Sequence, residues 1–236
     1  MIDFAKFEKK IGVKFKNKDL LKQAFTHRSY INENPSLAID HNERLEFLGD
    51  AVLEMAITEY LFRKFPQKTE GEMTALRAAL VNANMLFSVA RELSMGDFML
   101  LSKGEAKSLP AGQATAKAGQ YILANAIEAL IGAVYLDRGY ECAFKFLDQN
   151  VFGKLDYVIK NKLWIDAKSL FQEKAQEHDG ITPMYKVLKE SGPDHEKIFL
   201  VGIFLKGELI AEGEGASKQE AEQQAARNAL KKKRWE

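Results

Sequence analysis

The sequence predicts an all-α domain followed by a small α+β domain with the element order α-β-β-β-α. Up to about residue 152, apolar residues recur at three- and four-residue spacing, which is typical of amphipathic helices. Further along, one helical stretch precedes three short segments with strand-like patterns, and an Ala-rich helical stretch follows them. We therefore expect domains at 1–152 and 163–236, joined by a linker at 153–162.

The helices of the first domain begin with DFAKFEKKIGVKF and NKDLLKQAFTHRSYI, whose apolar residues have helical spacing. The chain from Asn42 to about Phe65 is predicted to be one long helix that Pro66 ends. In the next stretch Thr69 precedes Glu72 by three residues, which predicts a capping box at a helix start.

A polar loop rich in Gly, Ala and Gln is expected at 103–120. It separates the earlier helices from another long apolar helix at about 121–137, and the helical segment YECAFKFLDQNVF follows. No β-type alternation interrupts this half of the chain, so it is predicted to be helical throughout.

The second domain is predicted to start with the helix AKSLFQEKAQEHD. The strands MYKVLKESG, KIFLVGIFLKG and ELIAEGEG follow, and Lys206–Gly207 between the last two is a tight hairpin signal. Ser217 opens the Ala-rich final helix, and Glu220 is expected to complete a capping box with it.

The composition is that of an ordinary soluble globular protein, with 46% hydrophobic and 28% charged residues. Cys142 is the only cysteine, which excludes an internal disulfide and a cysteine-based zinc cluster. No signal-peptide core is visible, and the most apolar segment, 122–136, is too short and polar to span a bilayer, so we expect a cytoplasmic protein without a membrane partner. The 34 basic and 33 acidic residues nearly cancel, so nucleic-acid binding must rest on local motifs.

The segment HNERLEFLGDAVLEM, residues 41–55, places three acids on an otherwise apolar helix. At about 100° per residue, Glu43, Glu46 and Asp50 fall within an arc of roughly 60°. A helix that is apolar around most of its circumference is usually buried, and clustered buried carboxylates are costly unless a cation compensates them. We therefore expect a bound cation beside these acids.

The later apolar helix carries a similar polar stripe, because Asn125 and Glu128 lie three residues apart. If the two stripes meet, oxygen atoms from both helices surround one point. Oxygen ligands without His or Cys favour Mg²⁺, Mn²⁺ or Ca²⁺ over zinc. The alternative is that the acids only cap helices and form salt bridges with neighbours such as Arg44 and Arg77.

The segment ERLEFLGDAVLEMAI resembles the signature of the bacterial ribonuclease III family. The resemblance extends along nearly the whole chain, because FTHRSY, GEMTALRAALVN and ILANAIEALIGAVYLD occur in the family's order. The α-β-β-β-α tail resembles the family's double-stranded-RNA-binding domain. The loop at 108–120 departs from the family, which usually has a shorter Gly-Arg-rich segment there.

This resemblance implies an Mg²⁺-dependent endonuclease, with Mn²⁺ as a substitute ion and no small-molecule cofactor, that cleaves double-stranded RNA. It would act as a homodimer, with Phe47 matching an apolar residue that packs across the dimer interface. Each subunit would cut one strand and leave a 5′-phosphate and a short 3′ overhang, in the processing and decay of rRNA and mRNA.

The resemblance also assigns roles to the acids. Glu46, Asp50 and Glu128 match metal-binding carboxylates, and Asp50 and Glu128 are also expected to be catalytic. Asn125 matches a metal ligand that is more often Asp, so it keeps a carbonyl oxygen but lacks the charge. Glu43 matches an accessory acid one turn earlier on the same helix.

Five residues of the tail match the family's RNA contacts. Duplex RNA is recognised through its minor groove, phosphates and 2′-hydroxyls. Gln172 and Glu173 match a helix that lies in one minor groove, and His195 matches a loop that reaches a second one. Ser217 and Lys218, at the start of the last helix, suit the phosphates between these grooves, because free backbone N–H groups there attract anions.

Two other functions remain open. A catalytically silent duplex-RNA-binding protein could use the helical domain for dimerisation; Asn125 favours it, and the three metal-binding acids argue against it. A helical phosphohydrolase of small nucleotides would usually need His–Asp metal pairs, which are absent, and would leave the RNA-binding tail unexplained. His27 and His41 are interpreted as structural, because the four histidines show no ligand spacing.

Overall fold

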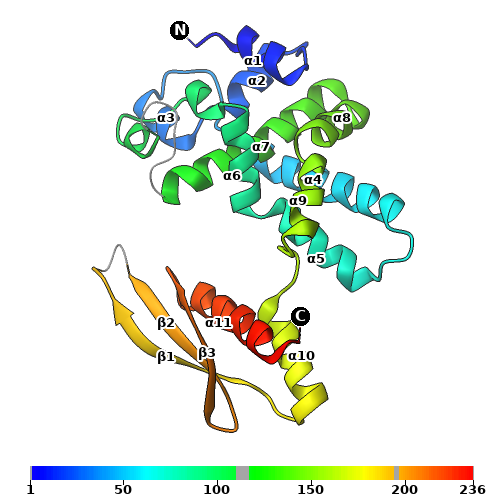
Figure 1. The fold of residues 1–236 in the computed structure, drawn as a ribbon. Coiled ribbons are helices and arrows are strands. Elements are labelled where there is room, and N and C mark those ends of the chain that lie inside the picture. The colour runs from blue at the N-terminus through cyan, green and yellow to red at the C-terminus, as the bar shows by residue number, and fades with distance from the viewer. Residues whose placement is uncertain (1, 110–116, 194–196, 236) are drawn as a thin grey trace. The chain divides into compact units, whose positions relative to one another are not determined.

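The computed structural model describes residues 2–109, 117–193 and 197–235. The chain forms two compact units, unit 1 (Met1–Trp164) and unit 2 (Ile165–Glu236). Unit 1 is helical and unit 2 contains a sheet with two helices (Figure 1), which confirms the predicted fold class.

The described helices of unit 1 are α1 (Phe4–Ile11), α2 (Lys18–Ala24), α3 (Arg28–Glu33), α4 (Glu43–Lys64), α5 (Glu70–Val81), α6 (Ala83–Glu92), α7 (Lys117–Arg138), α8 (Tyr140–Asn150) and α9 (Leu155–Lys160). The short 3-10 helices are η1 (Met95–Phe98), η2 (Glu105–Ser108) and η4 (Phe152–Lys154).

Local sequence signals explain where the helices around α5 begin and end. α4 stops two residues before Pro66, as predicted. The predicted capping box at Thr69 is confirmed, because its hydroxyl accepts from the N–H of Glu72 and the Glu72 carboxylate accepts from the N–H of Thr69. Asn82 then separates α5 from α6, since its side chain accepts from the N–H of Met85 and starts a second helix. The two helices are bent by 46° relative to each other.

α7 forms the centre of the unit 1 core and is longer than the sequence predicts. By length and composition alone, this helix and the bent α5–α6 pair could each cross a membrane. In α7, however, 67% of the most apolar window is buried inside the protein itself. Burial in a globular core therefore accounts for its apolar composition.

The segment 153–162 is part of unit 1 in the structure. It contains most of η4 and all of α9, in which Leu155 and Val158 are fully buried in the unit 1 core. Trp164 also packs against this core, and the ammonium of Lys68 lies 5.1 Å from the centre of its ring. The boundary between the units follows directly after this tryptophan.

Unit 2 has the predicted element order α-β-β-β-α. Its elements are α10 (Ala167–Asp179), β1 (Met184–Ser191), β2 (Ile198–Leu205), β3 (Glu208–Gly215) and α11 (Lys218–Lys233). The strands form an antiparallel sheet in the order β1-β2-β3, and α11 packs against it (Figure 1). The hairpin at Lys206–Gly207 is confirmed, and both residues have the positive φ that a tight hairpin turn requires.

The two ends of α11 are held by side chains. Ser217 accepts from the N–H of Glu220, but the predicted capping box is wrong in its other half. The Glu220 carboxylate reaches one residue further back and accepts from the N–H of Ala216 instead. At the other end, the ring of Trp235 stacks on His178 of α10, with the ring centres 5.0 Å apart. Trp235 thereby joins the two helices of unit 2.

Candidate functional site

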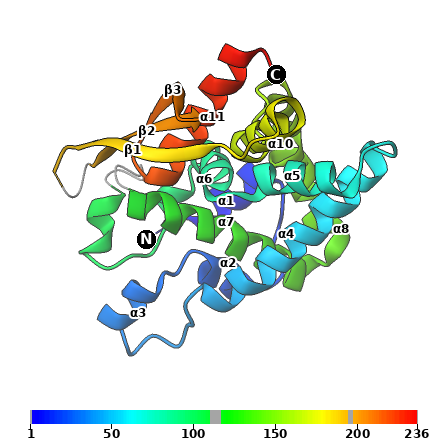
Figure 2. The same cartoon turned by 90° about the horizontal axis from the view of Figure 1, so that it is seen from below.

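α4 and α7 lie side by side (Figure 2) and touch through their backbones at two glycines. A β-carbon on Gly49 would lie 1.8 Å from the carbonyl oxygen of Glu128, and one on Gly132 would lie 2.3 Å from that of Leu45. Neither position accepts a larger residue unless a helix moves. Hydrophobic periodicity does not distinguish these two glycines from the residues around them. What could have indicated a close helix contact is that each apolar helix contains a glycine, a residue that is unfavourable in a helix interior unless packing requires it.

This crossing brings the predicted metal ligands of the two helices together. Burial raises the pKa of Glu128 to about 8, and the charges of Asp50 and Glu46 add to the effect. Burial and the neighbouring Glu43 also raise the pKa of Glu46. Against this, the Asn125 side chain donates a hydrogen bond to the Glu46 carboxylate. The four side chains therefore interact across the α4–α7 contact.

The expectation that α4 is buried on nearly all sides is wrong. Phe47, Met55 and Phe62 are 83%, 61% and 70% exposed, and Asp50 is exposed as well. One side of α4 packs on α7, and the helix also contacts α5 and α8, whereas these three apolar side chains remain mostly exposed. Glu46 is half-buried, because it lies at the edge of the packed side.

Salt bridges account for Glu43 but not for the other acids. The Glu43 carboxylate lies 3.5 Å from the Arg28 guanidinium and 3.8 Å from Nδ1 of His41. Arg77 pairs at 2.8 Å with Glu54, outside the site. In the part of the chain that the structure describes, Glu46, Asp50 and Glu128 form no salt bridge, so no basic side chain is paired with these three acids.

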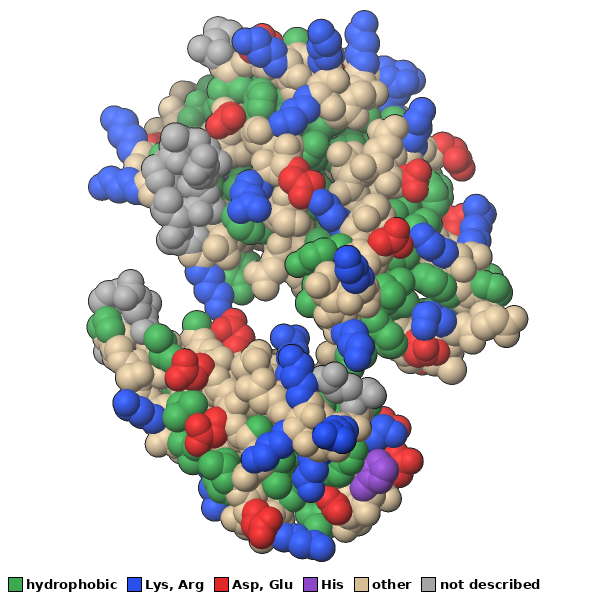
Figure 3. Space-filling model, viewed as in Figure 1, with side chains coloured by type: hydrophobic (Ala, Val, Ile, Leu, Met, Phe, Trp, Pro, Cys, Tyr) green, Lys and Arg blue, Asp and Glu red, His purple; other side chains and the backbone are tan. Residues whose placement is uncertain are grey.

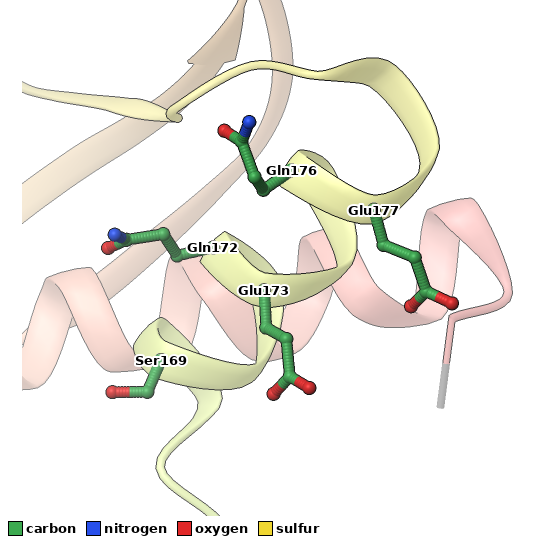
Figure 4. A pocket seen from close by; sticks show the side chains of 5 residues that line it. All are labelled: Ser169, Gln172, Glu173, Gln176 and Glu177. Atoms are coloured by element: carbon green, nitrogen blue, oxygen red, sulfur yellow. The ribbon is translucent and has the colours of Figure 1, made fainter.

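The helix α10 presents a polar surface along one side. Gln172 and Glu173 are exposed, and with Ser169, Gln176 and Glu177 they line a pocket of about 560 Å³ (Figure 4). In Figure 4 these side chains come from successive turns of one helix. The Glu177 carboxylate also accepts from the ammonium of Lys174 at 2.7 Å. Such a row of donors and acceptors suits contacts to hydroxyls and base edges in a minor groove.

The start of α11 offers a second polar surface. The Ser217 hydroxyl accepts from the helix backbone, which leaves its own O–H available as a donor. The ammonium of Lys218 lies 3.3 Å from the Glu190 carboxylate and 5.5 Å from the centre of the Phe199 ring. The predicted contact at His195 lies outside the described residues.

Comparison with known proteins identifies both units. Residues 17–155 match the family model described as Ribonuclease-III-like, and residues 167–233 match the double-stranded RNA binding motif. The chain belongs to the ribonuclease III family, a family of double-stranded-RNA endoribonucleases.

Ribonuclease III relatives align with almost the whole chain. Ribonuclease 3 of Carboxydothermus hydrogenoformans is 47% identical, over 94% of this chain and 92% of its own length. Ribonuclease 3 of Bacillus licheniformis is 46% identical, over 97% of this chain and 89% of its own length. The solved nuclease domain of ribonuclease III from Campylobacter jejuni matches with a TM-score of 0.54 and 40% identity, over 63% of this chain and 93% of that domain.

Membership of the ribonuclease III family suggests a divalent metal requirement. Across residues 2–109, 117–193 and 197–235, no three His, Cys, Asp or Glu side chains form a ready metal-binding group. The oxygen donors at the α4–α7 crossing nevertheless fit a hard divalent cation, since they are three carboxylates and one amide. Burial, and after it the charges of Asp50 and Glu46, raise the pKa of Glu128, and a bound divalent cation would offset both effects.

The charge distribution of this ribonuclease III is mixed. In the view of Figure 3, Lys and Arg side chains alternate with Asp and Glu on the surfaces of both units. This agrees with the net charge of +1.

Proposed function

We propose that this ribonuclease III hydrolyses phosphodiester bonds in double-stranded RNA with Mg²⁺, for which Mn²⁺ can substitute, and leaves 5′-phosphates and short 3′ overhangs. One observation carries the proposal: the α4–α7 crossing at Gly49 brings acids from two helices together. A protein that only bound RNA would gain nothing from this costly arrangement.

Glu46, Asp50, Asn125 and Glu128 would hold the metal ion. When bound, the ion supplies Lewis-acid stabilisation of the charge that develops on the scissile phosphate. Because the pKa of Glu128 is about 8, this residue holds a proton at neutral pH when no ion is present, and ion binding would release it. Asp50 is exposed and would orient water at the site, so Asp50 and Glu128 are the proposed catalytic residues.

We further propose a homodimer whose interface includes Phe47. The exposed apolar side of α4 supports this, because large exposed apolar patches mark interaction sites. A pocket of about 660 Å³ lies beside Phe47 and is lined in part by Leu48 and Leu136. A second solved Campylobacter jejuni nuclease domain, 39% identical with a TM-score of 0.54 over 63% of this chain and 98% of that one, is described as flexible in a region involved in dimer formation.

The proposed RNA contacts lie in unit 2. Gln172 and Glu173 of α10 would enter one minor groove, and His195 would reach the next. Ser217 and Lys218 would meet the phosphates between them, because the start of α11 combines an O–H donor, a cation and the positive end of a helix dipole. We place the protein in the cytoplasm, in the processing and decay of rRNA and mRNA.

Cleavage of labelled duplex RNA with Mg²⁺ tests the proposed function. Wild type should yield short duplexes, and Glu128→Gln should lose cleavage while it still binds the duplex. Glu54→Gln is a matched control, since it removes an acid of α4 that pairs with Arg77 outside the site. Intact RNA under tight wild-type binding would favour a binding-only protein. Hydrolysis of free nucleotides with duplex RNA untouched would favour the small-nucleotide phosphohydrolase.

A further inference from the structure

One face of the unit 2 sheet is turned away from its helices. Ile203 and Leu205 of β2 belong to the core that the sheet shares with α10 and α11. Because successive side chains of a strand point to opposite faces, Leu200, Gly202 and Phe204 lie on the outer face. This outer face is separate from the polar surfaces of α10 and α11.

The centre of this outer face is apolar. A β-carbon on Gly202 would lie 2.8 Å from Cδ1 of Leu209, 2.9 Å from Cδ1 of Leu188 and 3.0 Å from Cε2 of Phe204. Side chains from all three strands thus close over this glycine. The apolar residues of the face, here called the outer sheet patch, are Met184, Leu188, Ile198, Leu200, Phe204 and Leu209.

Such a patch is unusual for the outer face of an antiparallel sheet, which normally carries polar residues toward water. Met184 is 54% exposed and Ile198 is 48% exposed. Exposed apolar groups gathered in one place mark a surface that is covered by a partner.

The charges around the patch indicate which partner fits. Lys186 and Lys189 lie on β1 at one edge, and Glu212 and Glu214 lie on β3 at the other. Through their shared neighbours on β2, Lys186 is in register with Glu212 and Lys189 with Glu214. Within the described ranges, the side chains of Lys189, Glu212 and Glu214 form no ion pair. The patch therefore has one basic edge and one acidic edge.

We propose that the outer sheet patch binds the same patch of a second copy of this chain. Two sheets pack face to face about 10 Å apart. A twofold axis along the strands puts β1 of one copy opposite β3 of the other, so that both lysines meet both glutamates. A twofold axis across the strands would put lysine opposite lysine, which is unfavourable. The charge pattern thus selects one arrangement.

This contact is independent of the Phe47 surface and of the RNA-binding residues, which lie on other elements. It would link copies of the chain, including proposed nuclease dimers, into larger assemblies while leaving α10 and the start of α11 accessible. The proposal does not depend on catalysis, so failure of the cleavage assay and failure of this proposal are distinguishable.

Sedimentation of the full chain without RNA tests the association, at concentrations up to about 100 μM because small interfaces associate weakly. Wild type should show species of about twice the mass of those formed by Lys189→Glu or Glu214→Lys, because either single variant should abolish the sheet contact. The double variant Lys189→Glu/Glu214→Lys should restore the larger species, because the two charges exchange places. Duplex-RNA binding by each variant serves as the control for folding.

A cross-linking measurement gives a second readout. β2 lies at the proposed twofold axis, so Leu200→Cys in a Cys142→Ser background should form covalent dimers with a short bis-maleimide. Gln176→Cys on α10 is the control and should not. If the larger species are absent, or are equally abundant in the single charge variants, and Leu200→Cys does not cross-link, the proposal is overturned and the patch belongs to a different protein partner.

Discussion

The side-chain amide of Asn125 on α7 donates a hydrogen bond to the carboxylate of Glu46 on α4. This bond lowers the pKa of Glu46, which burial and the charge of Glu43 otherwise raise. An aspartate at position 125 would instead place two carboxylates in contact. The asparagine therefore reduces the repulsion at the α4–α7 crossing when no cation is present.

The variant Asn125→Asp should lower the Mg²⁺ concentration needed for half-maximal RNA cleavage. The added negative charge strengthens the attraction for a divalent ion, although it destabilises the ion-free site. A titration of cleavage rate against Mg²⁺ measures the shift. An unchanged titration would show that position 125 does not contact the ion.

The stability of the ion-free protein should fall as pH rises between about 4.5 and 8. Glu128 has an ordinary pKa of 4.5 that is raised to about 8 in the fold, so across this window the folded chain keeps a proton that the unfolded chain has lost. Unfolding followed in EDTA at several pH values measures this, and the decline should be shallower in Glu128→Gln. Stabilisation by Mg²⁺ should be larger at pH 8 than at pH 6. An identical pH profile in the variant would contradict the raised pKa.

Gly49→Ala should destabilise unit 1 by at least about 2 kcal/mol, because the added β-carbon would overlap the backbone of Glu128. Gly71→Ala is the matched control. It lies in the helix α5 with nothing near its β-carbon position, so its effect should be neutral or stabilising by up to about 1 kcal/mol. Urea denaturation of both variants makes the comparison. Equal stability of the two variants would argue against the close helix crossing.

Glu190→Gln should tighten duplex-RNA binding, because it releases the ammonium of Lys218 from its ion pair. Surface pairs contribute little, so the gain should be less than about fivefold at moderate salt. The binding constant for RNA should also fall more steeply with salt concentration, by the equivalent of about one additional counterion released on binding. Asp179→Asn is the control, since it removes a charge that pairs with Lys233 at the far end of α11. Binding curves at several salt concentrations measure both effects. An equal increase in RNA affinity in Glu190→Gln and Asp179→Asn would mean that the increase comes from the change in net charge and not from the release of Lys218.

Phe47→Glu should convert the proposed dimer into a monomer, because it puts a charge at the most exposed apolar residue of α4. Leu37→Glu, at another partly exposed apolar residue of unit 1, is the control. Light scattering at matched concentrations measures the molar mass. If the Phe47→Glu protein keeps the molar mass of the wild-type protein, the dimer interface does not include Phe47.

The elements of both units followed from local patterns, and the reason is physical. The capping box at Thr69 and the turn at Lys206–Gly207 depend on neighbours within a few residues, so the sequence alone reveals them. The stripe of Glu46 and Asp50 likewise depends only on helical periodicity.

What covers each helix face could not be predicted in the same way. Periodicity shows that α4 is apolar around most of its circumference, including Phe47 and Met55. It does not show that the side of the helix with these two residues is exposed in a single chain. The contact of Gly49 with Glu128 joins residues far apart in the sequence, so it depends on how α4 and α7 pack. The start of α11 shows that even a local signal can be misjudged. The Glu220 carboxylate accepts from the backbone N–H of Ala216, and not from that of Ser217 as the capping box predicts.

The chain has two tryptophans, and the fold gives one to each unit: Trp164 rests on the helical core, and Trp235 stacks on His178. Replacing either one by phenylalanine leaves a single tryptophan, which lies in the other unit and can be excited selectively over the seven tyrosines. The melting of the nuclease half and of the RNA-binding half can thus be recorded separately in the intact protein, without any attached dye.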